Sequence, residues 1–236
     1  QGVSSAASDV YKRQIHIFVL LIAGFIGGAI CILIPAITKV AFGVNEIITT
    51  LLTNYIVIGI TIYLINGPWK DPNSLNFPAA AYVDEEVFLP TIFGKLSFGF
   101  LICIFFTILA HYLKNKSVFG FEMRIAGGSA MTAVYAGINA KQKAFLAMLI
   151  GGGFAGLAGA IELLSQTHRV STGISQGFGY TAIIVAAITG MRPLGIFLVG
   201  SLFGALSIGG SVIQTIGVST YCLLYTSPSP RDGLLA

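Results

Sequence analysis

The chain of 236 residues is 55% hydrophobic and only 9% charged, whereas ordinary soluble domains carry about 25% charged residues. This composition excludes an ordinary soluble protein and indicates membrane-spanning helices, because several apolar runs reach the roughly 17–25 residues that a crossing needs. The formal net charge of +4 fits basic residues gathered in cytoplasmic loops, and no basic stripe interleaved with aromatic residues suggests a nucleic-acid partner.

The two ends differ in composition from the rest of the chain. Residues 1–14, "QGVSSAASDVYKRQ", are polar, and residues 221–236 are rich in Ser and Pro. Both segments resemble translated sequencing adaptors, so we expect them to be non-native and exclude them from the fold. Residues 15–220 then form a transmembrane domain that is a fragment of a longer one. Genuine disordered tails are the alternative, and they leave the functional interpretation unchanged.

The first two apolar runs predict two membrane spans. The run from Ile15 to Ile37 contains Gly24 and Gly28 at a spacing of four, which lets another helix approach closely and predicts a partner helix. A second span is expected from residue 47 to residue 65. Asn54 lies in its middle, and an amide in hydrocarbon must face neighbouring helices or a cavity.

The following segments predict a long aqueous loop and further spans. Residues 66–94 contain four prolines and an acidic cluster, which is typical of a loop. Spans are expected from Ser97 to Leu113 and from Ala144 to Leu164, the latter central because Gly and Ala recur four apart. Tyr180–Gly190 is too short for a full crossing and is interpreted as a broken or half helix, before a last run from residue 193 to residue 216. We therefore predict an all-α bundle of about five to six spans.

The distribution of basic residues predicts the orientation. If the loop from residue 114 to residue 143 is cytoplasmic, the inner side carries Lys39, Lys114, Lys116, Arg124, Lys141, Lys143 and Arg192. The outer side then carries only Lys70, Lys95 and Arg169. The positive-inside rule favours this topology, although the place of Arg192 requires that Tyr180–Gly190 crosses the membrane.

Within that loop, residues 124–144 predict a short helix at the membrane surface. Ser129 can cap a helix formed by "AMTAVYA", and Gly137 can end it in a left-handed conformation. Ala130, Ala133 and Ala136 would lie on one side, as a small, flat face for another protein. A simple connector is the alternative interpretation.

Four blocks occur in an order that resembles a known family. They are "GVNEIITTLLTNYI", "NGPWKDP", "RIAGGSAMTAVYAGI" and "AGLAGAIELLSQTHRVSTGISQGFGYTAIIVAAITGMRPLG". Together they resemble the membrane (permease) subunits of ATP-binding cassette importers for nucleosides and simple sugars, in the superfamily that also includes branched-chain amino acid permeases. The resemblance covers about residues 39–210. Ser129 and Ala130 stand where the family usually has Asn and Pro.

The resemblance implies a mechanism and partners. The counterpart of residues 124–138 is a cytoplasmic coupling helix that docks in a cleft of a separate ATPase, and the implied coupling residues are Arg124, Gly127, Gly128, Ala133, Tyr135, Ala136 and Gly137. Transport would proceed by alternating access in the bacterial inner membrane, with a second permease subunit and an extracytoplasmic substrate-binding protein. The sequence contains no G-x-x-x-x-G-K-[ST] motif, so we expect the partner to hydrolyse ATP and this chain to be no enzyme.

Four polar residues are candidates for the substrate pathway: Asn54, Tyr55, Gln166 and His168. Uncharged hydrogen-bonding groups suit a nucleoside or a sugar. For each residue the alternative is a hydrogen bond between helices. Glu162 is expected to reach water or Arg169 instead.

No metal, cofactor or catalytic group is expected. The cysteines Cys31, Cys103 and Cys222 form no disulfide framework and no metal spacing with a histidine, and His168 has no ligand-type neighbour. A branched-chain amino acid permease is the nearest rival function, but charged mid-span residues to hold a zwitterion are missing. A channel without ATPases and a membrane-embedded enzyme are the alternatives from other classes.

Overall fold

The computed structural model describes residues 2–72, 79–84, 87–93, 96–175 and 177–215. The chain divides into two compact units, residues 1–177 and 178–236, and each is described by itself. The segment 221–236, expected to be non-native, lies outside the described residues, as does the last residue of the run expected to end at residue 216.

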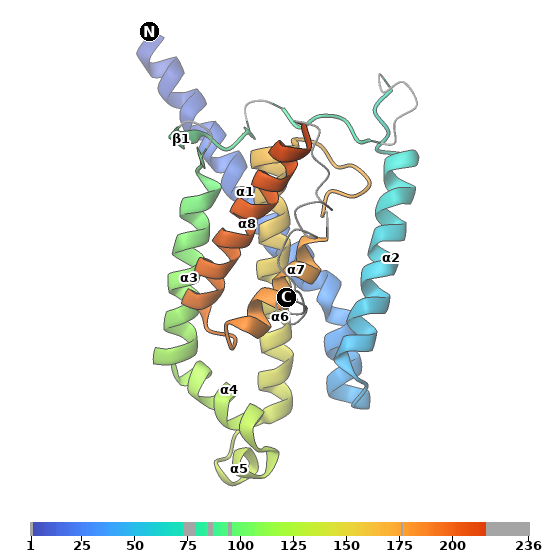
Figure 1. Cartoon of the computed structure of the whole chain (residues 1–236), viewed down its shortest axis with the longest axis vertical. Coiled ribbons are helices and arrows are strands. Elements are labelled where there is room, and N and C mark those ends of the chain that lie inside the picture. Colours follow the sequence, from blue (N-terminus) through green and yellow to red (C-terminus); the bar gives the residue numbers. More distant parts are fainter. Residues whose placement is uncertain (1, 73–78, 85–86, 94–95, 176, 216–236) are drawn as a thin grey trace, which may run out of the picture. The chain divides into compact units, whose positions relative to one another are not determined.

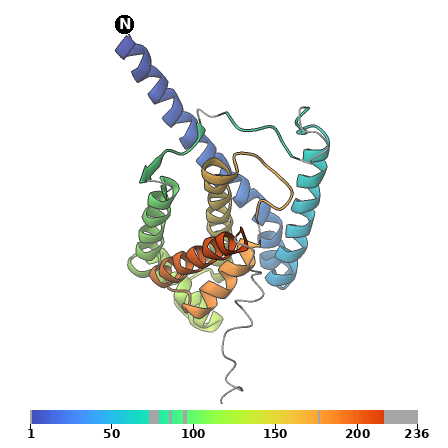
Figure 2. The ribbon, with the colours of Figure 1, turned by 45° about the horizontal axis from the view of Figure 1, so that its top comes forward.

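Helices dominate both units (Figures 1 and 2). Unit 1 contains α1 (Gly2–Phe42), α2 (Glu46–Asn66), the hairpin strands β1 (Thr91–Phe93) and β2 (Leu96–Ser97), α3 (Gly99–Lys116), α4 (Val118–Gly128), α5 (Ala130–Tyr135), α6 (Ala140–Glu162) and a π-helical turn (Leu163–Thr167). Unit 2 contains α7 (Phe178–Ile188) and α8 (Pro193–Thr215). Four described helices are long and apolar enough to cross a membrane, and the bent pair α3–α4 makes a fifth candidate. The predicted all-α polytopic fold is confirmed.

Helix α1 packs against α6 through glycines on both helices. A Cβ atom added to Gly28 would overlap the backbone of Gly152 and Gly156, and one added to Gly24 would lie 2.6 Å from the Cβ atom of Ala160. Residues further along α1 meet residues earlier in α6, so the two helices are antiparallel and cross with their backbones in contact (Figure 1). The predicted close helix partner of Gly24 and Gly28 is thus α6, and the prediction that α6 is central within unit 1 is confirmed.

Helix α2 contacts α1, and half-buried threonines and aliphatic residues recur along one side of it. The hydroxyls of Thr50, Thr53 and Thr61 donate to the backbone carbonyls four residues earlier, which satisfies these polar groups inside the helix. An ion pair between Lys39 and Glu46 joins the end of α1 to the start of α2. These three hydroxyls and this ion pair are therefore satisfied within the hairpin.

A sharp bend of 66° separates α3 from α4. Ser117 lies at the bend, where its hydroxyl accepts a hydrogen bond from the backbone N–H of Gly120 at 3.0 Å. Gly120 is essential to the corner, because a Cβ atom there would overlap the carbonyl oxygens of Leu113 and Lys114. The helix axis therefore changes direction at Ser117, and the chain continues in α4.

At the opposite end of unit 1, the loop after α2 is bonded to the end of α6. Backbone N–H groups of Ala80, Val83 and Leu89 donate to the carbonyls of Val170, His168 and Leu164, respectively, at 2.9–3.0 Å. The π-helical turn displaces the usual helical hydrogen bonds at this point. The loop and the far end of α6 are thereby held together.

Unit 2 is a helical hairpin with a short first arm. Helix α7 has 11 residues, which at 1.5 Å per residue spans about half of a bilayer core of about 30 Å. Gly190 and Met191 adopt left-handed conformations in the turn, with φ of 59° and 57°. The expected short helix is therefore present, with a tight turn before α8.

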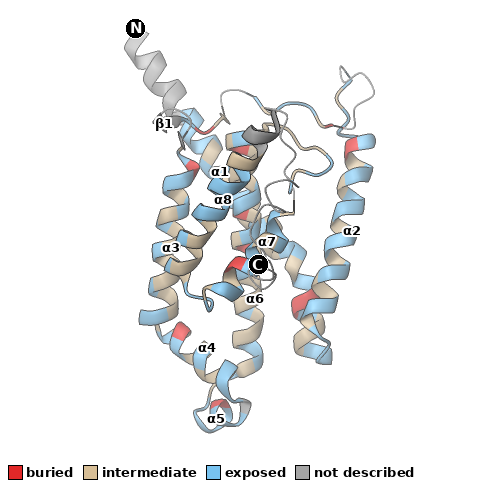
Figure 3. Ribbon diagram, viewed as in Figure 1, coloured by how far each residue is buried: buried red, intermediate tan, exposed pale blue. Residues whose placement is uncertain are grey.

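Among the residues that the structure describes, most large apolar side chains are exposed and few residues are buried (Figure 3). The fully buried large side chains are Pro35, Ile65 and Leu164. In water such a surface would drive aggregation, whereas in a bilayer it faces lipid or further helices.

We predict that Gly28→Leu separates α1 from α6 and lowers the free energy of unfolding by about 3 kcal/mol, because the side chain would overlap backbone atoms that have no alternative position. Unfolding by sodium dodecyl sulfate, followed by circular dichroism, measures the change. Gly27→Leu is the matched control, since nothing lies within 4 Å of a Cβ atom at Gly27. Equal stability of the two variants would contradict the crossing.

Candidate functional site

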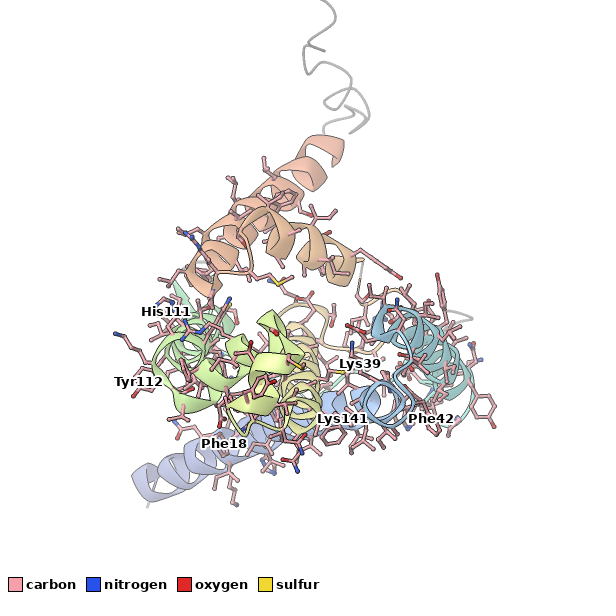
Figure 4. The ribbon with its side chains drawn as sticks, turned by 90° about the horizontal axis from the view of Figure 1, so that it is seen from below. Phe18, Lys39, Phe42, His111, Tyr112 and Lys141 are labelled. Carbon is pink, nitrogen blue, oxygen red and sulfur yellow. The ribbon has the colours of Figure 1, made fainter. Side chains whose placement is uncertain are left out.

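The site begins at the end of unit 1 that carries α4, α5 and the start of α6 (Figure 1). The junction of α1 and α2 lies at the same end, and Figure 4 views it directly, with Lys39 and Lys141 labelled. The described basic residues of this end are Lys39, Lys114, Lys116, Arg124, Lys141 and Lys143. Lys70 and Arg169 belong to the loops at the other end, and Lys12 and Arg13, in the segment expected to be non-native, lie near the start of α1 at that same end. Lys95 lies outside the described residues, and Arg192 belongs to unit 2. The described basic residues of unit 1 are thus more numerous at the end that carries α5, which is the direction that the positive-inside rule favours.

Helix α5 is short and capped at both ends. The hydroxyl of Ser129 accepts a hydrogen bond from the backbone N–H of Thr132 at 3.3 Å. Gly137 has φ of 69°, its N–H donates to the carbonyl of Val134 at 3.0 Å, and the N–H of Ile138 donates to that of Ala133 at 2.8 Å. This pair of bonds is a Schellman motif, which a left-handed glycine permits. The predicted caps at Ser129 and Gly137 are confirmed.

The exposed face of α5 differs from the predicted one. Ala133 is completely buried, so the expected flat surface of three alanines does not form. Met131, Val134 and Tyr135 are exposed instead, with 67%, 72% and 84% of their surfaces accessible. The prediction was wrong because it considered α5 alone, whereas α5 packs against both α4 and α6 and buries Ala133. The exposed surface is a bulky apolar knob, defined by Met131, Val134 and Tyr135.

The other predicted coupling residues surround this knob. Gly127 and Gly128 end α4 with open space where a Cβ atom would be, and Ala136 is the exposed C-cap of α5. Arg124 is exposed on α4 and lines a cavity described below. All of the predicted coupling residues therefore belong to one end of unit 1, on α4, α5 and the turn after α5.

An ion pair that the sequence did not suggest fixes the start of α6 to α4. Lys143 Nζ lies 2.5 Å from Glu122 Oε2 and 5.6 Å from the ring centre of Phe119. Asn139 caps α6 by accepting a hydrogen bond from the N–H of Gln142 at 3.2 Å. No local pattern joins residues 122 and 143, because the contact depends on the packing of two helices. Helix α5 is thus held between two helices that are also tied to each other.

The four predicted pathway residues lie in two separate places. Asn54 and Tyr55 are exposed in the middle of α2, and neither side chain has a hydrogen bond among the described residues. Gln166 and His168 lie at the π-helical turn after α6. Unit 1 contains a cavity of about 870 Å³ between α1 and α3 and one of about 410 Å³ beside the bend of α3 and α4. None of the four residues lines either cavity, so neither cavity brings them together.

His168 occupies a strained and largely enclosed position. Its φ is 52°, in the left-handed region that non-glycine residues rarely adopt. Its ring stacks on Phe88 with 3.8 Å between ring centres, and its Nδ1 atom and the hydroxyl of Thr167 are buried without a partner among the described residues. Unsatisfied buried polar atoms and π-helical turns are both typical of functional positions.

Glu162 was expected to reach water or Arg169, and of these two the contact with Arg169 is absent in the described residues. The guanidinium of Arg169 lies 5.0 Å from the ring centre of Tyr82 instead, in a cation–π contact. Glu162 is half-buried on α6 with no ion pair in the described part of the chain. The loop after α2 competes for Arg169, which the sequence could not show.

Comparison with known families identifies the chain. It matches the family described as branched-chain amino acid transport system / permease component over residues 2–227. The chain belongs to this family. With its long apolar helices, it is a multi-pass protein of the inner (plasma) membrane. No solved structure matches it.

Among curated proteins, this family member is similar to permeases with different named substrates. It is 32% identical to the guanosine ABC transporter permease protein NupP of Bacillus subtilis over 83% of the chain and 57% of that protein. It is 28% identical to the glucose ABC transporter permease protein TsgB13 of Haloferax volcanii, over 83% and 54%. It is 27% identical to the nucleoside ABC transporter permease protein NupB of Lactococcus lactis, over 87% and 59%. The chain therefore spans little more than half the length of these relatives.

We predict that Gly137→Val opens the end of α5, because a β-branched residue in a left-handed conformation costs about 1–2 kcal/mol. Hydrogen exchange at the amides of Gly137 and Ile138 in the parent, and of Ile138 in the variant, measures the effect. Exchange at Ile138 should become about tenfold faster. Gly128→Ala is the control, since space is open at Gly128, and an unchanged rate in Gly137→Val would contradict the capping role.

Proposed function

We propose that this chain is the permease subunit of an ATP-binding cassette importer for nucleosides or simple sugars. Family membership and the three named relatives support this proposal. The observation that carries it furthest is the capped helix α5, which presents an exposed knob at the basic end of unit 1. In this proposal that end faces the cytoplasm, and a separate ATPase subunit binds the knob and hydrolyses ATP.

The packing around α5 suits the transmission of force. Both ends of α5 are fixed by hydrogen bonds, Ala133 is buried against its neighbours, and α6 begins within a few residues of Ile138. A displacement of the knob is therefore passed to α6 rather than absorbed by a loose loop. Helix α6 in turn carries α1 with it, because their backbones are in contact. This is the type of rigid coupling that alternating access requires.

The polar groups of α2 support an uncharged substrate. Asn54 and Tyr55 are exposed at mid-span, and an amide in hydrocarbon is costly unless water, substrate or another helix satisfies it. We propose that a second permease subunit faces α2 and that the two subunits enclose the substrate pathway between them. Gln166 and His168 lie at the opposite end of unit 1 from α5. At that end an extracytoplasmic binding protein would release substrate into the pathway.

A branched-chain amino acid permease is the second candidate, favoured by the description of the matched family. A zwitterion needs charged or strongly dipolar partners in the pathway. The one carboxylate of α2, Glu46, lies at its first turn and is paired with Lys39. The described mid-span groups of α2 therefore favour the nucleoside or sugar proposal.

We predict that Val134→Asp combined with Tyr135→Asp abolishes substrate-stimulated ATP hydrolysis in the reconstituted transporter. Loss of an apolar anchor at a protein interface costs about 2 kcal/mol or more, so binding of the ATPase should weaken at least about thirtyfold. Steady-state hydrolysis and co-purification of the ATPase measure these two effects.

The matched control is Phe42→Asp combined with Val44→Asp, which adds the same two charges to exposed positions at the end of α1 and in the turn before α2, at the same end of unit 1. This pair should retain coupling. Equal loss in both pairs would show that any added negative charge at this end is harmful and would refute a docking role for the knob.

We predict that Asn54→Leu slows uptake about tenfold, because a lost hydrogen bond to a buried substrate costs about 1–3 kcal/mol. Uptake of radiolabelled nucleosides and glucose into proteoliposomes measures the change. Ile56→Leu, two residues further along α2, is the control. An unchanged rate for Asn54→Leu would remove this residue from the pathway.

A further inference from the structure

A second cavity of about 410 Å³ lies at the corner between α3 and α4, next to α6. Its walls are mainly apolar and include Ala110, Phe119, Ile150 and Phe154. Two cationic residues, Lys114 and Arg124, also line it. The cavity is separate from the exposed knob of α5 and from the predicted pathway residues, and it therefore needs its own explanation.

The charged and apolar parts of this cavity lie at different depths. Lys114 is in the last turn of α3, and Arg124 lies on α4 beyond the 66° bend. Along α6, the wall runs from Ala147 to Phe154, which is about 10 Å into the span at 1.5 Å per residue. The cavity thus has its two cations near the bend of α3 and α4, while an apolar wall extends from there along α6.

Two cationic residues and no carboxylate are among the residues that line the cavity. Glu122 is the acidic residue of α4, and it is paired with Lys143, whose ammonium also lies over the ring of Phe119. Lys116 and Lys141 add positive charge at the same end, but neither lines the cavity. An anion that enters the cavity would therefore meet Lys114 and Arg124. The carboxylate of Glu122 on α4 would repel it little, because Glu122 is paired with Lys143.

We propose that this cavity binds a phospholipid with an anionic headgroup. Its phosphate lies between Lys114 and Arg124, and an acyl chain fills the apolar walls of α3, α4 and α6. Basic pockets between membrane helices on the cytoplasmic side are a recognised class of acidic-lipid site. A free phosphate ion fits poorly, because most of the walls offer it no hydrogen-bond donor. The lipid would brace the bend at Ser117.

Native mass spectrometry of the purified membrane protein in detergent tests the proposal, with phosphatidylglycerol as the probe and phosphatidylcholine as the zwitterionic comparison. We expect phosphatidylglycerol to bind more tightly. Lys114→Gln or Arg124→Gln should each weaken its binding about fivefold, and the double variant about thirtyfold, given the usual contribution of one cation near a lipid headgroup.

The matched control is Lys116→Gln combined with Lys141→Gln, which removes two cations from the same end but outside the cavity. We expect less than a twofold change. An equal loss in the two double variants would show only diffuse attraction and would overturn the site. Equal binding of phosphatidylglycerol and phosphatidylcholine would also overturn it.

Two further experiments complete the test. The first asks whether the cavity binds a whole lipid or only a phosphate group, and the second changes the cavity without changing its charge. Excess inorganic phosphate should leave phosphatidylglycerol bound, and displacement would refute a lipid site in favour of a phosphate site. Ala147→Phe fills the cavity without changing charge and should reduce lipid binding. The unfolding temperature of the Ala147→Phe protein, compared with that of the parent, shows whether the variant is folded. If the two temperatures are equal and lipid binding is retained, the role of the apolar walls is refuted.

Discussion

The contact between the backbones of α1 and α6 is the constraint on which the rest of unit 1 depends. In a bilayer, apolar side chains gain little from leaving lipid for one another, so helices associate through close van der Waals contact. Gly24 and Gly28 on α1, with Gly152 and Gly156 on α6, remove the side chains that would prevent this contact. The rings of Phe25 and Phe154 pack edge to face beside the crossing. Helix α6 is thereby fixed within unit 1.

Because α6 is fixed, it connects the two ends of unit 1. At one end it is tied to α4 by Lys143 and Glu122, and it follows directly after the capped helix α5. At the other end, its π-helical turn and the residues after it accept hydrogen bonds from the loop that follows α2. A movement of α6 would therefore shift the loop after α2 and the stacked pair Phe88–His168 together with α5. This connection gives the proposed alternating-access cycle a physical route across the membrane.

The exposed surfaces of the chain fall into different classes. The knob of Met131, Val134 and Tyr135 is apolar but lies on a short helix next to basic residues, which suits a protein partner. The cavity at the bend of α3 and α4 combines cations with apolar walls, which suits a lipid. The exposed amide of Asn54 is isolated on an apolar helix, which suits a second helix, water or substrate. In the proposed transporter, each surface would therefore meet a different partner.

The sequence by itself determined the features that depend on local chemistry. Apolar length predicted the spans, the four-residue spacing of Gly24 and Gly28 predicted a close helix partner, and Ser129 and Gly137 predicted the ends of α5. The tertiary structure decided which surfaces are exposed and which distant residues meet. It buried Ala133, paired Glu122 with Lys143 and placed Arg169 on Tyr82 instead of beside Glu162. Caps and spans depend on neighbouring residues, whereas these contacts depend on helix packing, which no single segment encodes.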